Sequence, residues 1–438
     1  MPSPATTPKA AETVAARHRR RAQAMMAASG LDALVVVQPE NFRYITGAHP
    51  GFASAWRRAG TQIAVIPADD GLSPAAVIAD AIESAFRARS GFQDVRTHPM
   101  WVDYIDVESL AARDLSTRDL FAEVAKCCGD CGDHKAKPRQ RPATYDMGNA
   151  VRLLCDGLAD RKLLGARLGF EFEFLPTSDF KLFRAALPEA KLCDSSEMFR
   201  QLRLFKEPEE ITLLQEASDL TEIGIGHALR GLKVGETGFE IAMRYRAGVM
   251  EEAVRRGDVR LESIWNFNNC GAITFGKDPN TVILKEGDGV KFDCGCTIAG
   301  HTSDIGRTYV FGKGSRHQRA IHEALLDAWE TGFEQLRPGN PLSAVHAAAQ
   351  GRMRALGYPD YNRGHVGHGI GSSIWLEEWP FIAADATVII QPNMVFSYEL
   401  PYYVNGIGAF IVEDQIVITE NGPKSMNANL PKGYCEIF

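Results

Sequence analysis

The sequence lacks the features that mark membrane, secreted and nucleic-acid-binding proteins. No stretch reaches the roughly 18 uninterrupted apolar residues that a membrane-spanning helix needs. The first 25 residues carry four arginines but no apolar run of the kind found in a signal peptide. Positive charge is not in excess, since 48 Lys and Arg face 55 Asp and Glu, for a net charge of -7. We therefore expect a cytoplasmic protein with neither a nucleic-acid nor a membrane partner.

Cysteine is also sparse. The nine cysteines are an odd number spread over 438 residues, unlike the even and dense disulfide framework of a small secreted domain. Three of them, Cys127, Cys128 and Cys131, lie with His134 in one polar segment. These four ligands could close a zinc site, although zinc ligands more often form two widely spaced pairs. A solvated loop or an insertion is the alternative, and the residues leave both open.

What is present has the composition of an ordinary globular protein. Hydrophobic residues make up 45% and charged residues 24% of the chain, which is close to the average for folded domains. Helical and strand patterns alternate to about residue 192, beginning with a helix over 12–29 that Gly30 ends and strands over 33–37 and 62–66. We expect a mixed α/β (α+β) protein with two domains, over 1–200 and 201–438.

The second domain begins with strong helix signals. Pro208 opens a helix that is expected to run to about residue 229. Thr237 and Glu240 form a capping box at the start of the next helix. A third helix is expected over 315–336, where a proline and a glycine follow.

Two segments of this domain resemble each other. The segments that end at Asp293 and at Glu399 each have an apolar start, a turn and a partly apolar run that finishes on a carboxylate. A second carboxylate follows 11 and 14 residues later, at Asp304 and Glu413. We infer an internal duplication with pseudo-twofold symmetry, which would bring four carboxylates toward one centre.

Four carboxylates around one pocket would require cations, because an unpaired buried carboxylate is costly to desolvate. His368 lies in the glycine-rich run 364–371 and supplies a nitrogen ligand. One imidazole with four carboxylates suits Mn²⁺, Fe²⁺ or Co²⁺.

These motifs resemble those of the pita-bread metallohydrolases, the family of aminopeptidase P, prolidase, methionine aminopeptidase and creatinase. The matching elements of the second domain are Asp293-Cys294-Gly295, Thr302-Ser303-Asp304-Ile305-Gly306-Arg307-Thr308, Gly367-His368-Gly369-Ile370-Gly371, Tyr398-Glu399-Leu400-Pro401 and Val412-Glu413-Asp414. Those of the first domain, which resembles the creatinase and aminopeptidase P N-terminal domain, are Gly30-Leu31-Asp32-Ala33-Leu34 and Asn41-Phe42-Arg43-Tyr44-Ile45-Thr46-Gly47. The resemblance implies a creatinase-like N-terminal domain followed by a pita-bread catalytic domain.

The resemblance also implies a cofactor of two divalent metal ions, which could be Mn, Fe, Co or Zn. Asp293 would chelate one ion with both oxygens, Asp304 and Glu413 would bridge the pair, and His368 and Glu399 would complete the other shell. A metal-bridged hydroxide would then attack a C–N bond, peptide or amide-like, in a short peptide or other small molecule. We therefore expect a metallohydrolase similar to Xaa-Pro dipeptidase and aminopeptidase P.

Family members often form homodimers, and we expect one here. Their N-terminal domains often cover the pocket of the neighbouring subunit. Trp56, Arg57 and Arg58 are therefore candidates for reaching a partner, with an ordinary surface patch as the alternative.

Three positions differ from the usual peptidase pattern. A histidine that usually precedes a proline is missing from Phe275-Gly276-Lys277-Asp278-Pro279. The usual His-Glu-x-Pro element is replaced by Trp375-Leu376-Glu377-Glu378-Trp379-Pro380, with Glu377 where the histidine would fall. The usual arginine two residues before the last ligand is Ile411. Because the ligands are kept and substrate-facing groups are lost, we expect a changed substrate rather than strict Xaa-Pro specificity.

The altered segments supply the candidate catalytic residues. Glu377 and Glu378 are possible acid–base groups, because apolar neighbours would raise their pKa toward neutrality. An ion pair with an arginine at the rim is the alternative for either one. His365 is a further catalytic candidate, with a structural hydrogen bond as the alternative. The candidate substrate-binding residues are Lys277, Trp375 and Trp379.

A second function remains open. The Glu-Glu-Trp-Pro element resembles the Asp-Glu-Trp-Pro of the dimethylsulfoniopropionate lyases, in which a carboxylate abstracts a proton. Those lyases tend to show Asp-x-Asp at the first ligand, whereas this chain has Asp293-Cys294-Gly295. The alternative is therefore a metal-dependent lyase with Glu377 or Glu378 as base. A metal-free binding protein with the same fold is a third possibility.

Overall fold

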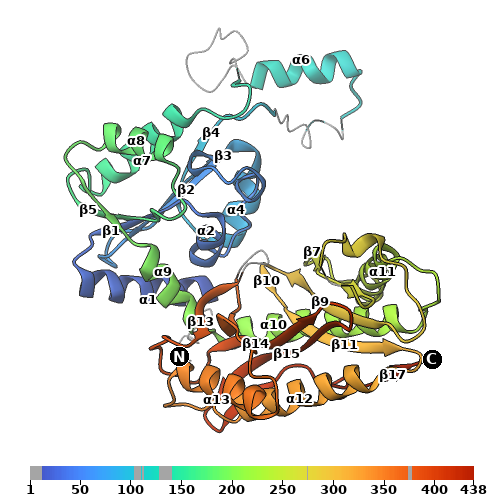
Figure 1. Ribbon diagram of the computed structural model, residues 1–438. Helices are drawn as coiled ribbons and strands as arrows, with labels where there is room; N and C mark the ends of the chain where they lie inside the picture. Colours follow the sequence, from blue (N-terminus) through green and yellow to red (C-terminus); the bar gives the residue numbers. More distant parts are fainter. Residues whose placement is uncertain (1–11, 103–109, 111–112, 128–140, 274, 373–376) are drawn as a thin grey trace, which may run out of the picture. The chain divides into compact units, whose positions relative to one another are not determined.

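The computed structural model describes residues 12–102, 110, 113–127, 141–273, 275–372 and 377–438. The chain divides into two compact units, Met1–Phe199 and Arg200–Phe438. Each unit has its own sheet and its own helices (Figure 1). The described residues contain no helix that is long and apolar enough to cross a membrane.

The first unit is built on a six-stranded mixed sheet in the order β4-β3-β2-β1-β5-β6. Its strands are β1 (Ala33–Val36), β2 (Gln62–Pro67), β3 (Ala75–Ala79), β4 (Asp94–His98), β5 (Arg167–Phe170) and β6 (Lys191–Asp194). Its helices are α1 (Val14–Ser29), α2 (Pro39–Thr46), α3 (Ala53–Trp56), α4 (Glu83–Ser90), α6 (Thr117–Cys127), α7 (Met147–Asp160) and α8 (Thr177–Ala186), and α9 (Ser196–Leu204) runs into the second unit. The inner strands are wholly buried, which explains their continuous apolar runs.

The first helix ends where the sequence predicts and starts two residues later than predicted, at Val14. Thr13 accepts a hydrogen bond from the backbone of Ala16 at the start of α1, and Gly30 closes its end with a φ of 67°. A left-handed residue at that position favours glycine because no Cβ is present. The observed strands β1 and β2 also match the expected runs within one residue at each end.

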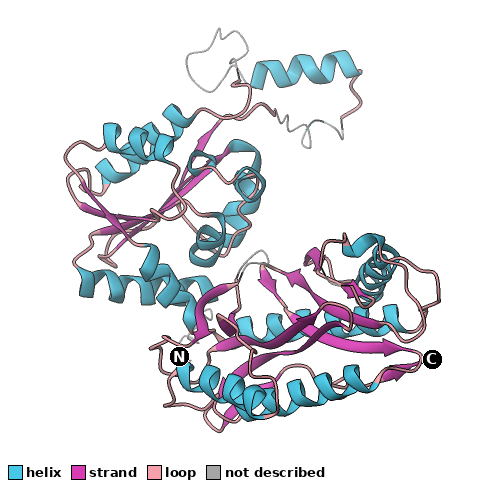
Figure 2. Cartoon of the chain, viewed as in Figure 1, coloured by secondary structure: helices cyan, strands magenta, loops and turns pink. Residues whose placement is uncertain are grey.

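The second unit has an eleven-stranded sheet whose main path runs β10-β9-β11-β15-β14-β12-β13. These strands are β9 (Gly289–Ile298), β10 (His301–Thr302), β11 (Ile305–Phe311), β12 (His365–Gly369), β13 (Glu378–Ala383), β14 (Val395–Val404) and β15 (Gly408–Thr419). Pairing at its margins are β7 (Leu261–Asn266), β8 (Asn269–Cys270), β16 (Gly422–Ser425) and β17 (Glu436–Ile437). Figure 2 shows how much of this unit the strands occupy.

Four long helices cover this sheet in two pairs. They are α10 (Pro208–Leu229), α11 (Gly238–Arg256), α12 (Arg316–Phe333) and α13 (Leu342–Ala355). The first pair shares an apolar core with β9 and β11, and the second pair shares one with β14 and β15. Because β11 pairs with β15, the two halves meet at the centre of the sheet, as the inferred duplication requires.

The predicted helix starts are confirmed in this unit, and one predicted end is wrong. Thr237 and Glu240 form the expected capping box of α11. Helix α12 ends at Phe333 instead of residue 336. The next residues continue in tighter turns, with the amide of Gln335 donating to the carbonyl of Gly332 and that of Leu336 to Phe333.

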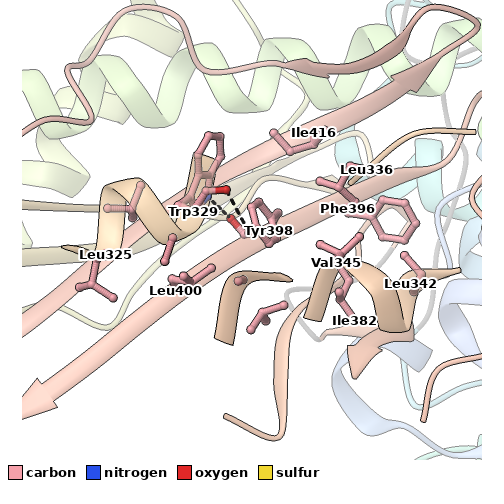
Figure 3. Packing of buried hydrophobic residues seen from close by; sticks show 14 of the residues in the cluster. Leu325, Trp329, Leu336, Leu342, Val345, Ile382, Phe396, Tyr398, Leu400 and Ile416 are labelled. Carbon is pink, nitrogen blue, oxygen red and sulfur yellow. Dashed lines mark hydrogen bonds between the residues drawn. The ribbon is translucent and has the colours of Figure 1, made fainter. Parts of the chain in front are cut away.

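The core under the second half of the sheet is anchored by an aromatic pair. The indole nitrogen of Trp329 on α12 donates to the carbonyl of Tyr398 on β14 at 3.1 Å, and the Tyr398 hydroxyl donates to the Trp329 carbonyl at 3.1 Å (Figure 3). Both side chains are buried. This reciprocal contact fixes α12 against the strand that carries Glu399.

Candidate metal centre

The central strands place the four candidate carboxylates and the histidine near one another. Gly306 on β11 lies opposite Asp293 on β9 and also opposite Glu413 on β15. Glu399 on β14 lies opposite Glu413, and His368 comes from β12, the next strand along the sheet. Asp304 immediately precedes β11. Antiparallel pairing of inner strands thus fixes the positions of four of the five residues, and Asp304 is held at the start of β11.

Gly306 keeps the middle of this arrangement open. A Cβ atom on Gly306 would lie 2.5 Å from Oε2 of Glu413, well inside normal contact distance. Any side chain at this position would therefore displace the Glu413 carboxylate. The glycine of the Asp-x-Gly-Arg-Thr motif has a direct steric role.

Three of the five residues form a tight group. Ligand atoms of Asp304, His368 and Glu413 all lie within 4.8 Å of one another, and all three residues are buried. His368 Nδ1 donates to the carbonyl of Gly369 at 3.0 Å, which leaves Nε2 facing Oδ2 of Asp304 at 3.5 Å. Such a backbone partner is how metal-binding histidines are commonly oriented.

The side chains of the centre carry a surplus of negative charge. Burial, followed by the charges of Asp304, Asp293 and Glu399, raises the pKa of Glu413 well above its usual value. Burial raises the pKa of Asp304 to about 6 and that of Glu399 to about 7. Burial opposes charge on His368, but the hydrogen bond and charge of Asp304 raise the His368 pKa to about 9. Each shift reduces the net negative charge.

Two oxygens of the centre have no hydrogen-bond partner within the described part of the protein. Among the described residues, Oδ1 of Asp304 and Oε2 of Glu413 are buried without a hydrogen-bond donor. Buried carboxylate oxygens are normally paired, and such an orphan indicates an ion or water. Hard oxygen ligands with one imidazole fit a divalent cation of the Mn²⁺, Fe²⁺, Co²⁺ or Zn²⁺ type.

The other two carboxylates have protein cations beside them. Nζ of Lys291 lies 2.8 Å from Oδ2 of Asp293. Oε1 of Glu399 lies 3.5 Å from the Arg363 guanidinium and 3.5 Å from Nδ1 of His365. The sequence reasoning missed both Lys291 and Arg363. For Lys291 the signal was available, because residues two apart on a strand share a face.

The two adjacent glutamates have different surroundings in the structure. Glu378 is buried on β13, and its Oε1 accepts a hydrogen bond from Arg203, which also donates to the carbonyl of Ser372 at 2.8 Å. Glu377 precedes the strand, and its side chain is 51% exposed with Oε2 3.6 Å from Nε2 of His365. His365 thus lies between Glu377 and Glu399, within reach of both. Of the two glutamates, Glu377 is the one that lies beside His365.

The remaining candidates lie elsewhere. Lys277 is exposed in the segment between β8 and the short helix over Pro279–Thr281. Trp379 is half-buried and packs against the core of the second unit. Trp375 lies outside the described residues, as do the side chains of the Cys127, Cys128, Cys131 and His134 segment.

The three residues that were candidates for reaching a partner subunit make contacts within the first unit. Trp56 stacks on Trp101 with ring centroids 4.8 Å apart. Arg57 pairs with Glu40 at 2.7 Å. Arg58 donates two hydrogen bonds to the fully buried Asp179, at 2.6 and 3.0 Å.

Comparison with known proteins finds a matching family model for each unit. Residues 212–420 match the model of metallopeptidase family M24, and residues 18–94 match the creatinase/prolidase N-terminal domain. A putative dipeptidase of Bacillus subtilis is 28% identical over 277 residues, covering 63% of this chain and 75% of the relative. The Xaa-Pro dipeptidase of Lactobacillus helveticus is 28% identical over 288 residues, covering 64% and 75%.

Solved structures show the same fold over nearly the whole chain. The Xaa-Pro dipeptidase from Bacillus anthracis aligns with a TM-score of 0.75 at 20% identity, covering 97% of this chain and all of that one. The X-Pro aminopeptidase from Thermotoga maritima aligns with a TM-score of 0.72 at 19% identity, covering 96% and 99%. The relatives named here are peptidases, and none of them supports the lyase alternative.

Proposed function

Because this chain belongs to metallopeptidase family M24, we propose that it is a metal-dependent hydrolase that cleaves the C–N bond of a short peptide or an amide-like small molecule. The observation that carries the proposal is the buried group of Asp304, His368 and Glu413, in which two carboxylate oxygens have no donor among the described residues. A purely structural cluster of acids would be expected to have these oxygens paired.

The five residues Asp293, Asp304, His368, Glu399 and Glu413 would hold two divalent ions. When bound, such ions supply Lewis acidity, which polarises the substrate carbonyl and makes water a stronger nucleophile near neutral pH. The protein contributes fixed ligand positions, because four of the five residues lie on paired strands of the central sheet. The fifth, Asp304, is held at the start of β11.

Glu377 is the acid–base group of this proposal, and His365 is the catalytic candidate that positions it. Oε2 of Glu377 would accept the proton released during attack and return it to the departing nitrogen. Nε2 of His365, 3.6 Å away, would hold the Glu377 carboxylate in place. Glu378 is excluded from this role by its buried pairing with Arg203, and it would instead position the start of β13.

The substrate would differ from a strict Xaa-Pro dipeptide. Ile411 is buried and apolar where peptidases of the family usually carry an arginine, so one charged group that could bind a substrate is missing. The exposed Lys277 remains available to attract an anionic substrate group. We therefore propose a broader or altered amide specificity.

The test is amide hydrolysis by Mn²⁺-loaded protein, measured as amino-acid release from Xaa-Pro dipeptides and from matched dipeptides without proline. Turnover that disappears in Asp304→Asn would support the hydrolase. Metal bound without turnover of any amide would contradict it. Sedimentation of the same preparation would test the homodimer that the family resemblance implies.

A further inference from the structure

A buried lysine lies directly beside the candidate metal centre. Lys291 on β9 is 2% exposed, and its ammonium group has three acceptors around it. Nζ donates to Oδ2 of Asp293 at 2.8 Å, to the Tyr403 hydroxyl at 3.2 Å and to the carbonyl of Phe267 at 3.5 Å. An ammonium has three donors, so these contacts use all of them. The lysine is fixed in one position and cannot swing away from Asp293 without losing all three contacts.

This lysine shares a face of the sheet with the ligands. Lys291 and Asp293 are two residues apart on one strand, so their side chains point the same way. Across the sheet, Thr308 on β11 lies opposite Lys291, as Gly306 lies opposite Asp293. The ammonium group of Lys291 therefore lies on the same face of the sheet as the carboxylates and next to them. It is buried in the protein rather than exposed to solvent.

The five proposed ligands are unequal because of this contact. Asp304, His368 and Glu413 form the compact group, and two of their oxygens have no donor among the described residues. Asp293, in contrast, already has a cation on Oδ2. An ion bound at Asp293 would have to share that carboxylate with an ammonium group of the same sign of charge.

We propose that Lys291 is a positioning residue that holds one oxygen of Asp293 and thereby makes the Asp293 side of the centre the weaker of its two divalent-ion positions. The inference rests on the proposed metal-dependent function and deepens it. In the two-oxygen chelation that the family resemblance implies, Oδ2 of Asp293 would be shared between the ion and the ammonium group of Lys291. The buried ammonium partly neutralises the carboxylates when the weaker position is empty.

The experiment is a calorimetric titration of the metal-free, full-length protein with Mn²⁺ at constant pH. The wild type should show two classes of site with dissociation constants at least about tenfold apart. Lys291→Met keeps the length of the side chain but removes its charge. In this variant the weaker site should tighten by about tenfold or more, while the tighter site changes by less than about threefold.

Two further variants separate charge from packing. Lys291→Arg keeps the charge, so its weaker site should stay weak even if the fold is perturbed, as circular dichroism of the metal-free protein would reveal. Lys313→Met removes an exposed lysine of the same unit and should leave both sites unchanged. A second site that is unchanged or weaker in Lys291→Met would overturn the inference, as would a wild type with two equal sites. Failure to bind Mn²⁺ at all would instead overturn the proposed function itself.

Discussion

The guanidinium of Arg203 on α9 pairs with the carboxylate of Glu378 on β13, and both side chains are at least 87% buried. This pair distinguishes two glutamates that are neighbours in the chain. Glu378 is neutralised inside the protein, whereas Glu377 is half-exposed beside His365.

We therefore expect Glu377→Gln to lower kcat by about a hundredfold or more, because proton transfer by a placed group typically contributes that much. Its unfolding free energy should change little, since the side chain is half-exposed. Glu378→Gln should instead destabilise the second unit by about 3 kcal/mol, because it removes the negative charge that faces the buried guanidinium of Arg203. Steady-state kinetics and urea unfolding of both variants would check this, and the reverse pattern would contradict the assignment.

Metal removal should destabilise the protein as well as inactivate it. Any ligand that binds the folded state adds stability, by about 3 kcal/mol at a free concentration of a hundred times Kd. A chelator should therefore lower the Tm of the wild type. Asp304→Asn removes a proposed central ligand, and its Tm should respond much less to the chelator. Equal responses of the two proteins would argue against a role of Asp304 in metal binding.

His322 on α12 should make the second unit sensitive to acid. Burial and the nearby charge of Arg307 lower the His322 pKa from 6.5 to about 4. A lowered folded-state pKa favours the neutral form, so its stability contribution is complete above pH 6.5 and is lost as the pH falls toward 4. His322→Phe should remove a loss of about 3 kcal/mol between these pH values. Urea unfolding of both proteins at several pH values would show it, and parallel pH profiles would contradict it.

The Trp329–Tyr398 pair should behave as one unit in folding. Trp329→Phe removes the donor to the Tyr398 carbonyl, and Tyr398→Phe removes the donor to the Trp329 carbonyl. Each change should cost about 1 kcal/mol of unfolding free energy, because it removes one buried hydrogen bond. Since the rings are in contact, the double variant should depart from additivity by at least about 0.5 kcal/mol. Strict additivity in a double-mutant cycle would show that the two contacts act independently.

Sequence reasoning was most successful where local rules decide the structure. Capping residues such as Thr237 and the glycine after α1 act within one turn of the chain, so their roles can be read without tertiary information. The five candidate ligands could be predicted because their motifs are short and occur in order. The structure brings Asp304, His368 and Glu413 together from three different strand regions.

Sequence reasoning was weakest where distant residues decide the environment of a side chain. The difference between Glu377 and Glu378 depends on Arg203, which is 175 residues away from Glu378 along the chain. The surroundings of Lys291 include Tyr403, 112 residues away. Neither partner can be inferred from local pattern, because it is the register of paired strands and the path of α9 that create the contact.

The pairing of β14 with β15 continues without a break over ten residue pairs, and Glu399 opposite Glu413 lies at its middle. Breaking one of these pairs requires breaking its neighbours, so local opening at the two glutamates should be as rare as unfolding of the whole unit. Amide hydrogens on either side of them should be among the slowest in the chain to exchange with solvent. Ions would therefore enter and leave without opening this strand pairing, and their exchange should be much faster than that of these amide hydrogens.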